Sequence, residues 1–180
     1  IYSRHLVFFS LEINQIDDEK LEALLKSNKA LNRYKPVFDN LRKLKNHQLS
    51  DELEEFLHDQ SVVGSTAWNR LFDETIAALK FTVNGEELNI ESTLNLLSDN
   101  NRENRKAGAE EVAKVLGKNI SIFSRITNTL SKEKEIEDRW RKMPSPQTGR
   151  HLSNDVEPEV VEALRSAVVT SYPKISHRYL

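Results

Sequence analysis

One continuous stretch decides the fold: SDELEEFLHDQSVVGSTAWNRLFDETIAAL, residues 50–79. Ser50 is a favourable N-cap, and the acidic residues after it lie where the helix dipole stabilises negative charge. The apolar residues recur mostly at steps of three and four, which places them on one face of a helix. They are Leu53, Phe56, Leu57, Val63, Ala67, Trp68, Leu71, Phe72, Ile76 and Leu79. The pattern predicts one helix of about 27 residues, with Gly64 in its middle permitting close packing or a bend.

The residues after this helix carry a β signal. The sequence FTVNGEEL, residues 81–88, has Asn84-Gly85 at its centre, and this dipeptide tolerates the positive φ angles of a type I′ turn. With those two residues at the turn, Phe81 faces Leu88, and two residues further from the turn on each strand Leu79 faces Ile90. A hairpin of this size is marginal alone, so we expect it to lie against helices.

The composition agrees with a helical chain. Glycine and proline supply only five residues each of 180, so few residues interrupt the secondary structure. The expected fold class is therefore all-α, mainly long antiparallel helices, with one small β-hairpin near residues 80–90. The chain has no cysteine, which excludes disulfides, thiolate metal sites and a cysteine nucleophile, and agrees with a reducing compartment.

Charge and hydropathy exclude two further classes of partner. The 26 basic residues are balanced by 28 acidic ones, which leaves no positive excess to attract a nucleic acid. No apolar stretch approaches the ~20 residues that a membrane-spanning helix needs. We therefore expect no nucleic-acid partner and no membrane partner.

Shorter helices are expected on both sides of the central region. Residues 1–16 carry a broad apolar stripe, and Asp17 or Asp18 then caps a short helix. Pro36 suits the first turn of the next helix. After the hairpin, Asn100 with Glu103 has the spacing of a capping box.

Three of the five prolines fall close together near the end of the chain. Pro144, Pro146 and Pro158, with Gly149 between them, predict a loop over residues 143–158. We therefore expect a helical lobe over residues 1–142, this proline-containing loop, and the first helices of a following region over residues 159–180.

No catalytic centre is recognisable in the residues themselves. The five histidines are isolated, without the H-E-x-x-H spacing that binds zinc on a helix, so we predict no catalytic and no metal-ligating residue. The glycines also stand alone, so no phosphate-binding loop is present. The segment around Trp68 is more typical of core packing than of a binding site.

One basic group remains as a candidate site: Arg139, Arg141, Lys142, Arg150 and His151, interleaved with Trp140. Arginine presents a planar fork of donors, so such a group could receive a carboxylate or a peptide backbone. The candidate substrate-binding residues are Arg139, Arg150 and His151. The alternative is that these side chains tie a loop to its own helices, and the sequence leaves that alternative open.

The order of several segments resembles the N-terminal region of the oligoendopeptidase F-like zinc peptidases, in the thimet-oligopeptidase clan. The resemblance covers nearly the whole chain, and its specificity lies in the collinear order of the segments rather than in any one motif. The segments are Gly64–Glu74, the hairpin of residues 81–88, Leu96–Asp99, Arg102–Ala107, Arg139–Met143, Asn154–Val156, and the run to Tyr172-Pro173 that closes on His177–Tyr179.

This resemblance implies a cytoplasmic zinc metalloendopeptidase that hydrolyses peptide bonds in short peptides. In the family, an H-E-x-G-H helix and a downstream glutamate bind one zinc ion, and the motif's own glutamate acts as general base on the metal-bound water. Those residues lie C-terminal to this lobe, so we carry over none. The chain would be a piece of a longer polypeptide, incomplete at its N-terminus and inactive alone. Its partners would be the catalytic remainder of that polypeptide and, in the parent enzyme, short peptides.

Two other functions stay open. The segment Leu96–Asp99 followed by Arg105–Ala107 also resembles the start of a HEAT-type repeat, a protein-interaction scaffold with no enzymatic role. Such arrays need about three copies to bury their faces, and no second copy occurs at a ~40-residue period. The second is a helical module that binds another protein through an exposed apolar stripe.

Overall fold

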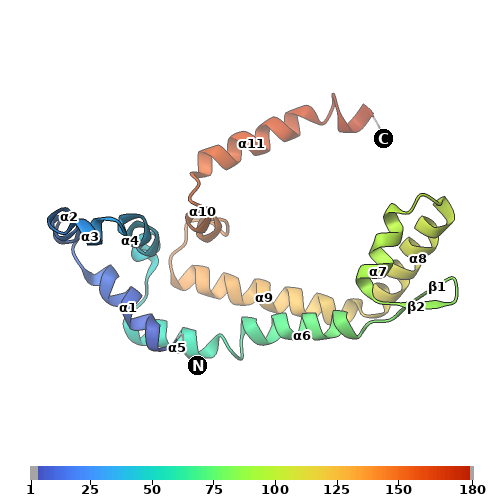
Figure 1. Cartoon of the computed structure of the whole chain (residues 1–180), viewed down its shortest axis with the longest axis horizontal. Coiled ribbons are helices and arrows are strands. Elements are labelled where there is room, and N and C mark those ends of the chain that lie inside the picture. The colour runs from blue at the N-terminus through green and yellow to red at the C-terminus, as the bar shows by residue number, and fades with distance from the viewer. Residues whose placement is uncertain (1–3, 179–180) are drawn as a thin grey trace. The chain divides into compact units, whose positions relative to one another are not determined.

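The computed structural model describes residues 4–178, which are almost entirely helical with one β-hairpin (Figure 1). In chain order the elements are α1 (Arg4–Gln15), α2 (Asp18–Ser27), α3 (Lys29–Asn32), α4 (Lys35–Arg42), η1 (Lys45–His47), α5 (Asp51–Gln60), α6 (Ser65–Ala78), β1 (Phe81–Val83), β2 (Glu86–Leu88), α7 (Ile90–Asn95), η2 (Leu96–Ser98), α8 (Arg102–Lys118), α9 (Ile120–Trp140), α10 (Thr148–Asn154), α11 (Pro158–Ser171) and η3 (Ser176–Arg178). The expected class, mainly α-helical with a small hairpin, is confirmed.

The chain forms two compact units. One unit combines the residues up to His58 with those from Ile136 onward, and the other is Asp59–Glu135. The chain passes between the units within α5 and again within α9. The expected division into a lobe over residues 1–142 and a following region over residues 159–180 stays a prediction. None of the helices within residues 4–178 combines the length and the apolar character that a membrane span requires.

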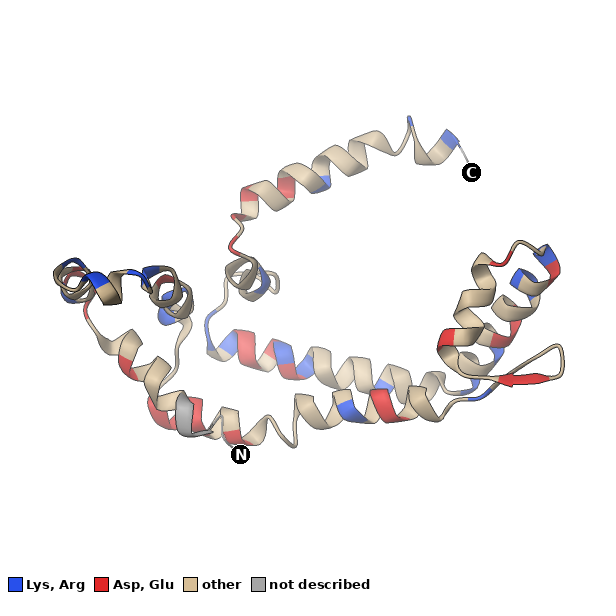
Figure 2. Cartoon of the chain, in the orientation of Figure 1, with Lys and Arg blue, Asp and Glu red and all other residues tan. Residues whose placement is uncertain are grey.

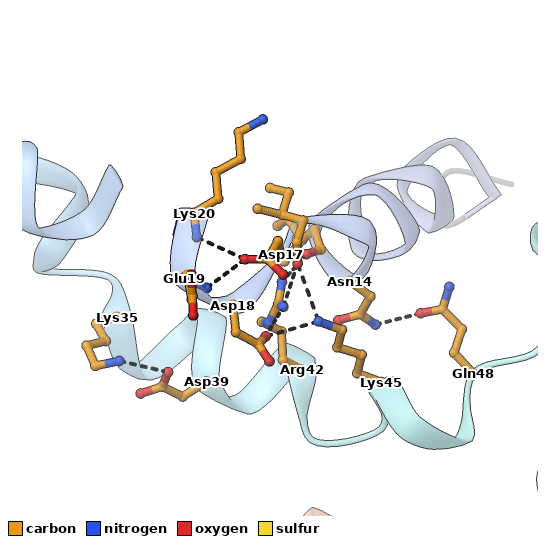
Figure 3. Close-up of polar contacts among 12 residues, drawn as sticks. Asn14, Asp17, Asp18, Glu19, Lys20, Lys35, Asp39, Arg42, Lys45 and Gln48 are labelled. Atoms are coloured by element: carbon orange, nitrogen blue, oxygen red, sulfur yellow. Dashed lines mark hydrogen bonds and ion pairs between the residues drawn. The ribbon is translucent and has the colours of Figure 1, made fainter. Parts of the chain in front are cut away.

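In the first unit, α1 and α2 meet at a capped corner. Asp17 is the N-cap of α2, and its carboxylate accepts the backbone N–H groups of Glu19 at 3.0 Å and Lys20 at 3.3 Å (Figure 3). This confirms one of the two caps that the sequence offered. The helix predicted over residues 1–16 is observed as α1, and residues 1–3 lie outside the described chain. Pro36 lies in the first turn of α4, as predicted.

In the second unit, the hairpin forms with the predicted turn and central register. Asn84 and Gly85 have φ angles of 53° and 87°, and Phe81 pairs with Leu88. Phe81 is fully buried because α8 packs against β1. The second expected pair is wrong. Leu79 is the C-cap of α6 and Ile90 already begins α7, so the ladder ends before it reaches them.

The single helix predicted over residues 50–79 is also wrong, because α5 and α6 are separate helices with a turn at residues 61–64 between them. Gly64 is the N-cap of α6 and has no side chain with which to cap it. The cap comes from α9 instead, where Glu133 Oε1 accepts the backbone N–H of Ser65 at 3.1 Å. Because the residue that caps α6 is so distant in the sequence, the local spacing of apolar residues does not reveal where α6 begins.

Helices α6 and α9 run antiparallel within this unit (Figure 1). Ser65 at the start of α6 meets Glu133 late in α9, whereas Phe72 late in α6 meets Phe123 early in α9. The two phenyl rings lie 5.7 Å apart at 64°, an edge-to-face contact that adds to the area buried. The core-packing role expected of the segment around Trp68 is not met, because no residue of α6 is buried; Phe72 makes this ring contact but still leaves 43% of its surface exposed.

Helix α8 begins one residue later than the capping box predicts. Asn101, not Asn100, is the N-cap, and its Oδ1 accepts the backbone N–H of Glu103 at 2.9 Å. Further along α8, Gly108 is buried where the helix crosses η2. A Cβ at this position would lie 3.0 Å from the Leu96 Cβ, so glycine permits the close approach.

The segment predicted as a loop over residues 143–158 contains the helix α10, so that prediction is wrong in its centre. None of the prolines interrupts α10, because Pro144 and Pro146 precede it and Pro158 is the first residue of α11. Asp155 ends α10 in the left-handed conformation, with φ of 55°. Helix α11 follows, and its residues are exposed except Ser171, which is half-buried.

Candidate functional site

The candidate basic group begins where α9 ends. Lys142 adopts a left-handed conformation with φ of 53°, which stops the helix after Trp140. The backbone N–H of Met143 then donates to the Asp138 carbonyl at 2.8 Å, so the last turn of α9 is closed by its own chain. Arg141 therefore lies at the end of α9, where its side chain can reach helices that are far away in the sequence.

Arg141 uses its guanidinium donors within the protein. Nη1 and Nη2 donate to the two Glu54 carboxylate oxygens at 2.5 and 2.9 Å, and Nε donates to Glu137 at 2.7 Å. Nη1 also donates to the His47 carbonyl at 3.3 Å, and His47 Nδ1 donates to the Arg141 carbonyl at 3.0 Å. The end of α9 is thereby fastened to α5 and to η1.

The electrostatics of this pair are those of a partly buried ion pair. Burial by itself raises the pKa of the Glu54 carboxyl, but hydrogen bonds from Arg141 and from the Leu49 N–H hold that pKa below its ordinary value. The hydrogen bond with Glu54 likewise raises the pKa of the Arg141 guanidinium, against the effect of burial. Because the donors of Arg141 are engaged, the alternative that arginine ties the chain to its own helices is realised at this residue.

The three candidate substrate-binding residues lie on two different helices. Arg139 is exposed near the end of α9, whereas Arg150 and His151 are neighbours on α10. The Arg150 side chain is exposed and makes no hydrogen bond or ion pair with any residue in 4–178, whereas His151 is half-buried. A substrate role for the three residues stays a prediction.

A salt bridge ties α10 to the rest of its unit. Lys43 Nζ, at the end of α4, lies 3.0 Å from Asp155 Oδ1, which follows α10. Within α10, Thr148 Oγ1 accepts the backbone N–H of Ser145 at 3.1 Å. The exposed guanidinium of Arg150 is thus presented by a short helix whose two ends are both held.

A second cluster of charged residues fastens α1 to α4, and sequence reasoning did not predict it. Arg42 donates to the Ile13 carbonyl, to the Ile16 carbonyl at 2.6 Å, and to the Asp18 carboxylate (Figure 3). Lys45 donates to the same Asp18 oxygen at 3.0 Å. Hydrogen bonds from Lys45 and then from Arg42 hold the pKa of the Asp18 carboxyl below its ordinary value.

This second cluster caps a helix rather than forming a ligand site. Arg42 donates to the Ile13 and Ile16 carbonyls, at and just beyond the C-terminus of α1, where the last carbonyl groups of a helix lack their usual intrahelical partners. A cation is also favourable there because the helix dipole is negative at that end. In both clusters the arginine donors are bound by groups of the same chain, so Arg141 and Arg42 each fasten elements of the fold together.

One family model and one solved structure are similar to this chain. Residues 12–81 match the family model described as Oligopeptidase F. The fold is similar to the crystal structure of oligoendopeptidase-F from Enterococcus faecium, with a TM-score of 0.80 and 21% identity, over 95% of this chain and 35% of that chain. The resemblance to oligoendopeptidase F is confirmed.

The likeness to oligoendopeptidase F concerns part of that protein's length. The chain spans 35% of the length of the solved oligoendopeptidase-F chain, and at 21% identity the structural match establishes a shared fold. No curated protein sequence matches the chain. The family match covers residues 12–81, which is less than half of the chain.

The likeness to oligoendopeptidase F implies a zinc ion, and the residues that the structure describes do not fit one. Zinc needs three or four converging His or carboxylate ligands in the absence of cysteine. Within residues 4–178 no group of three or more His, Asp or Glu side chains is placed to hold a metal. His47 already directs its Nδ1 to the Arg141 carbonyl. No zinc chemistry is therefore assigned to these residues.

Proposed function

We propose that this chain is the N-terminal, non-catalytic helical lobe of a zinc-dependent, cytoplasmic oligoendopeptidase, which hydrolyses peptide bonds in short peptides. The observation that carries the proposal is the match of residues 12–81 to the oligopeptidase F family, on a fold shared with oligoendopeptidase-F. In this proposal the catalytic residues and the zinc ion belong to the remainder of the polypeptide.

The role proposed for the lobe is steric. A wall of a narrow channel must keep its shape, so that short unfolded peptides enter and folded proteins do not. Two features of the chain suit that role. In one unit the ion pair of Arg141 with Glu54 fixes the end of α9 to α5, and in the other Glu133 and Phe123 of α9 hold α6.

Helix α11 supports the proposal that further protein covers this chain. Its apolar residues are exposed, and they are Val160, Val161, Leu164, Val168 and Val169. Leu164, for example, leaves 66% of its surface exposed. A contiguous apolar surface of this kind is typical of a face that another part of a protein covers. The proposed occupant is the catalytic remainder of the same polypeptide.

A cleavage assay tests the proposal. The full-length gene product and the 180-residue chain are each incubated with an internally quenched fluorescent oligopeptide, with and without a chelator. We expect chelator-sensitive cleavage by the full-length product only. Cleavage by the 180-residue chain alone would contradict the non-catalytic role, and no cleavage by either would overturn the peptidase proposal.

A second assay tests the steric role. The same cleavable sequence is offered to the full-length product as a free peptide and as a segment inside a stably folded protein domain. The proposed wall predicts rapid cleavage of the free peptide and none of the folded protein. Equal rates on both substrates would contradict a narrow channel, even where the peptidase activity itself is present.

A further inference from the structure

The segment from Lys26 to Lys45 has a strongly uneven charge. It contains seven lysine and arginine residues and one acidic residue, Asp39. In Figure 2 the blue of lysine and arginine recurs along α2, α3 and α4. The whole chain is nearly neutral, so this segment is a local excess of positive charge that the composition conceals.

The basic residues of this segment fall into two sets. Those from residue 35 onward are paired with carboxylates. Lys35 lies 3.1 Å from Glu22, for example, and Arg42, Lys43 and Lys45 each have an acidic partner. These pairs join helices within the unit, so carboxylates of the same chain already neutralise their positive charges.

The second set, Lys26, Lys29 and Arg33, has no such partner. All three residues are exposed and make no hydrogen bond or ion pair with the side chains that the structure describes. Glu22 has the i,i+4 spacing to pair with Lys26, but its carboxylate is bound by Lys35 instead. The three cations are therefore free to meet an external anion.

Apolar side chains accompany these three cations. Leu31, Tyr34 and Val37 lie in the same segment and leave 40%, 56% and 53% of their surfaces exposed. We call this set of exposed residues of one segment, Lys26, Lys29, Arg33, Leu31, Tyr34 and Val37, the α2–α4 basic surface. A segment in which exposed cations are interspersed with exposed apolar and aromatic residues suits a peptide that carries both carboxylates and apolar side chains.

We propose that the α2–α4 basic surface is a docking site for an acidic peptide segment that carries apolar residues between its carboxylates. The site is separate from the proposed peptidase chemistry and does not depend on it. Charge complementarity selects the partner, because three unpaired cations attract carboxylates and raise the rate of encounter with them.

Two other anionic partners fit this surface less well. A lipid surface favours a long continuous amphipathic helix or a cluster of about four to eight cations. Here α3 has only four residues, and Asn28 separates it from α2, so the segment is not one continuous helix. A nucleic acid favours a chain with a large positive excess, which the near-neutral composition does not provide.

The test measures binding by the 180-residue chain, without any cleavage step. A fluorescein-labelled short peptide, with glutamate pairs separated by single Leu or Phe residues, is titrated by fluorescence anisotropy. The matched control peptide has glutamine in place of every glutamate. We expect saturable binding of the acidic peptide that weakens as NaCl is raised, and much weaker binding of the glutamine peptide.

Two triple variants locate the site. The variant K26E/K29E/R33E should bind the acidic peptide at least about tenfold more weakly, because three charge contacts are reversed. The control R102E/K118E/R125E changes the total charge equally, at exposed positions of the other unit, and should bind within about twofold of the wild type. Circular dichroism verifies that both variants keep their helix content.

Several results would overturn the proposal. They are no saturable binding of the acidic peptide, equal affinity for the glutamine peptide, or an equal loss of affinity in both triple variants. Preferential binding to phosphatidylserine vesicles over the acidic peptide would assign the surface to lipid instead. None of these results bears on peptide cleavage by the full-length product, so the two proposals fail independently.

Discussion

The Arg141 guanidinium donates two hydrogen bonds to the Glu54 carboxylate, at 2.5 and 2.9 Å, although 87 residues separate them in the chain. Both side chains are largely shielded from solvent, with 18% and 14% of their surfaces exposed. A bidentate pair of this kind is stronger and more directional than an ordinary surface ion pair. This contact fastens α5 to the end of α9.

The substitution Arg141→Ala should destabilise the chain substantially. Removing one partner leaves the Glu54 carboxylate partly buried without its cation, and the expected loss of unfolding free energy is about 1–3 kcal/mol. Urea denaturation followed by circular dichroism measures it. The matched control is Arg165→Ala, which removes an exposed pair with Glu162 and should leave the urea midpoint unchanged. Equal effects of the two substitutions would contradict the role given to Arg141.

The same pair predicts a dependence of stability on pH. The folded-state pKa of Glu54 lies below its ordinary value of 4.5, so the unfolded chain takes up this proton at a higher pH than the folded chain does. The stabilisation from Glu54 is therefore complete above about pH 5 and is lost as the pH falls through the folded-state pKa.

Comparison with Glu54→Gln isolates this contribution from those of other carboxylates. The hydrogen bonds from Lys45 and then Arg42 also lower the pKa of Asp18, so both proteins should lose stability in acid. The wild type should be the more stable protein at neutral pH, and its advantage over Glu54→Gln should shrink as the pH falls below about 4.5. An advantage that stays constant from neutral pH into acid would contradict the assignment to Glu54.

The cap supplied to α6 from α9 gives a third prediction. A Cβ at residue 64 would lie 2.5 Å from Glu133 Oε1, so Gly64→Ala should displace the carboxylate that accepts the Ser65 N–H. We expect a loss of about 1 kcal/mol of unfolding free energy, the usual effect of losing a helix cap. Glu133→Ala should cost a similar amount.

A double-mutant cycle measures whether the two substitutions act on the same contact. If Gly64→Ala destabilises by displacing Glu133, the substitution should cost much less once Glu133→Ala has removed the carboxylate. Strictly additive effects in the double variant would show that the glycine is needed for some other reason.

Two glycines within α8 give a fourth prediction, with opposite signs. At Gly108 a Cβ would lie 3.0 Å from the Leu96 Cβ, so Gly108→Ala should destabilise the chain by overpacking, by about 1–3 kcal/mol. At Gly117 a Cβ would meet nothing within 4 Å, so Gly117→Ala should stabilise the helix by up to about 1 kcal/mol. Thermal or urea unfolding of both variants checks the pair. Stabilisation by both substitutions would contradict the close approach of α8 to η2.

Features that depend on neighbouring residues could be predicted from the sequence. The turn at Asn84-Gly85 is fixed by the tolerance of those two residues for positive φ, and it brings Phe81 opposite Leu88. Asp17 caps α2 for an equally local reason, because its short carboxylate reaches the free N–H groups of the next turn.

Features that depend on distant residues could not be predicted. Periodicity continues through residues 61–64, but the chain turns there and Glu133 supplies the new helix start. Nothing near Arg141 in the sequence indicates that Glu54 occupies its donors, so the sequence could not decide whether the basic group binds a ligand or the fold. Only the three-dimensional contacts distinguish those alternatives.

The central claim is that this chain is the non-catalytic lobe of a zinc-dependent oligoendopeptidase. It is tested most directly by the rate at which the full-length product cleaves a quenched fluorescent oligopeptide before chelation, after chelation, and after zinc is returned. The account predicts cleavage that the chelator abolishes and zinc restores, with none by the 180-residue chain alone. Cleavage that is indifferent to the chelator, or no cleavage by the full-length product at any stage, would contradict it.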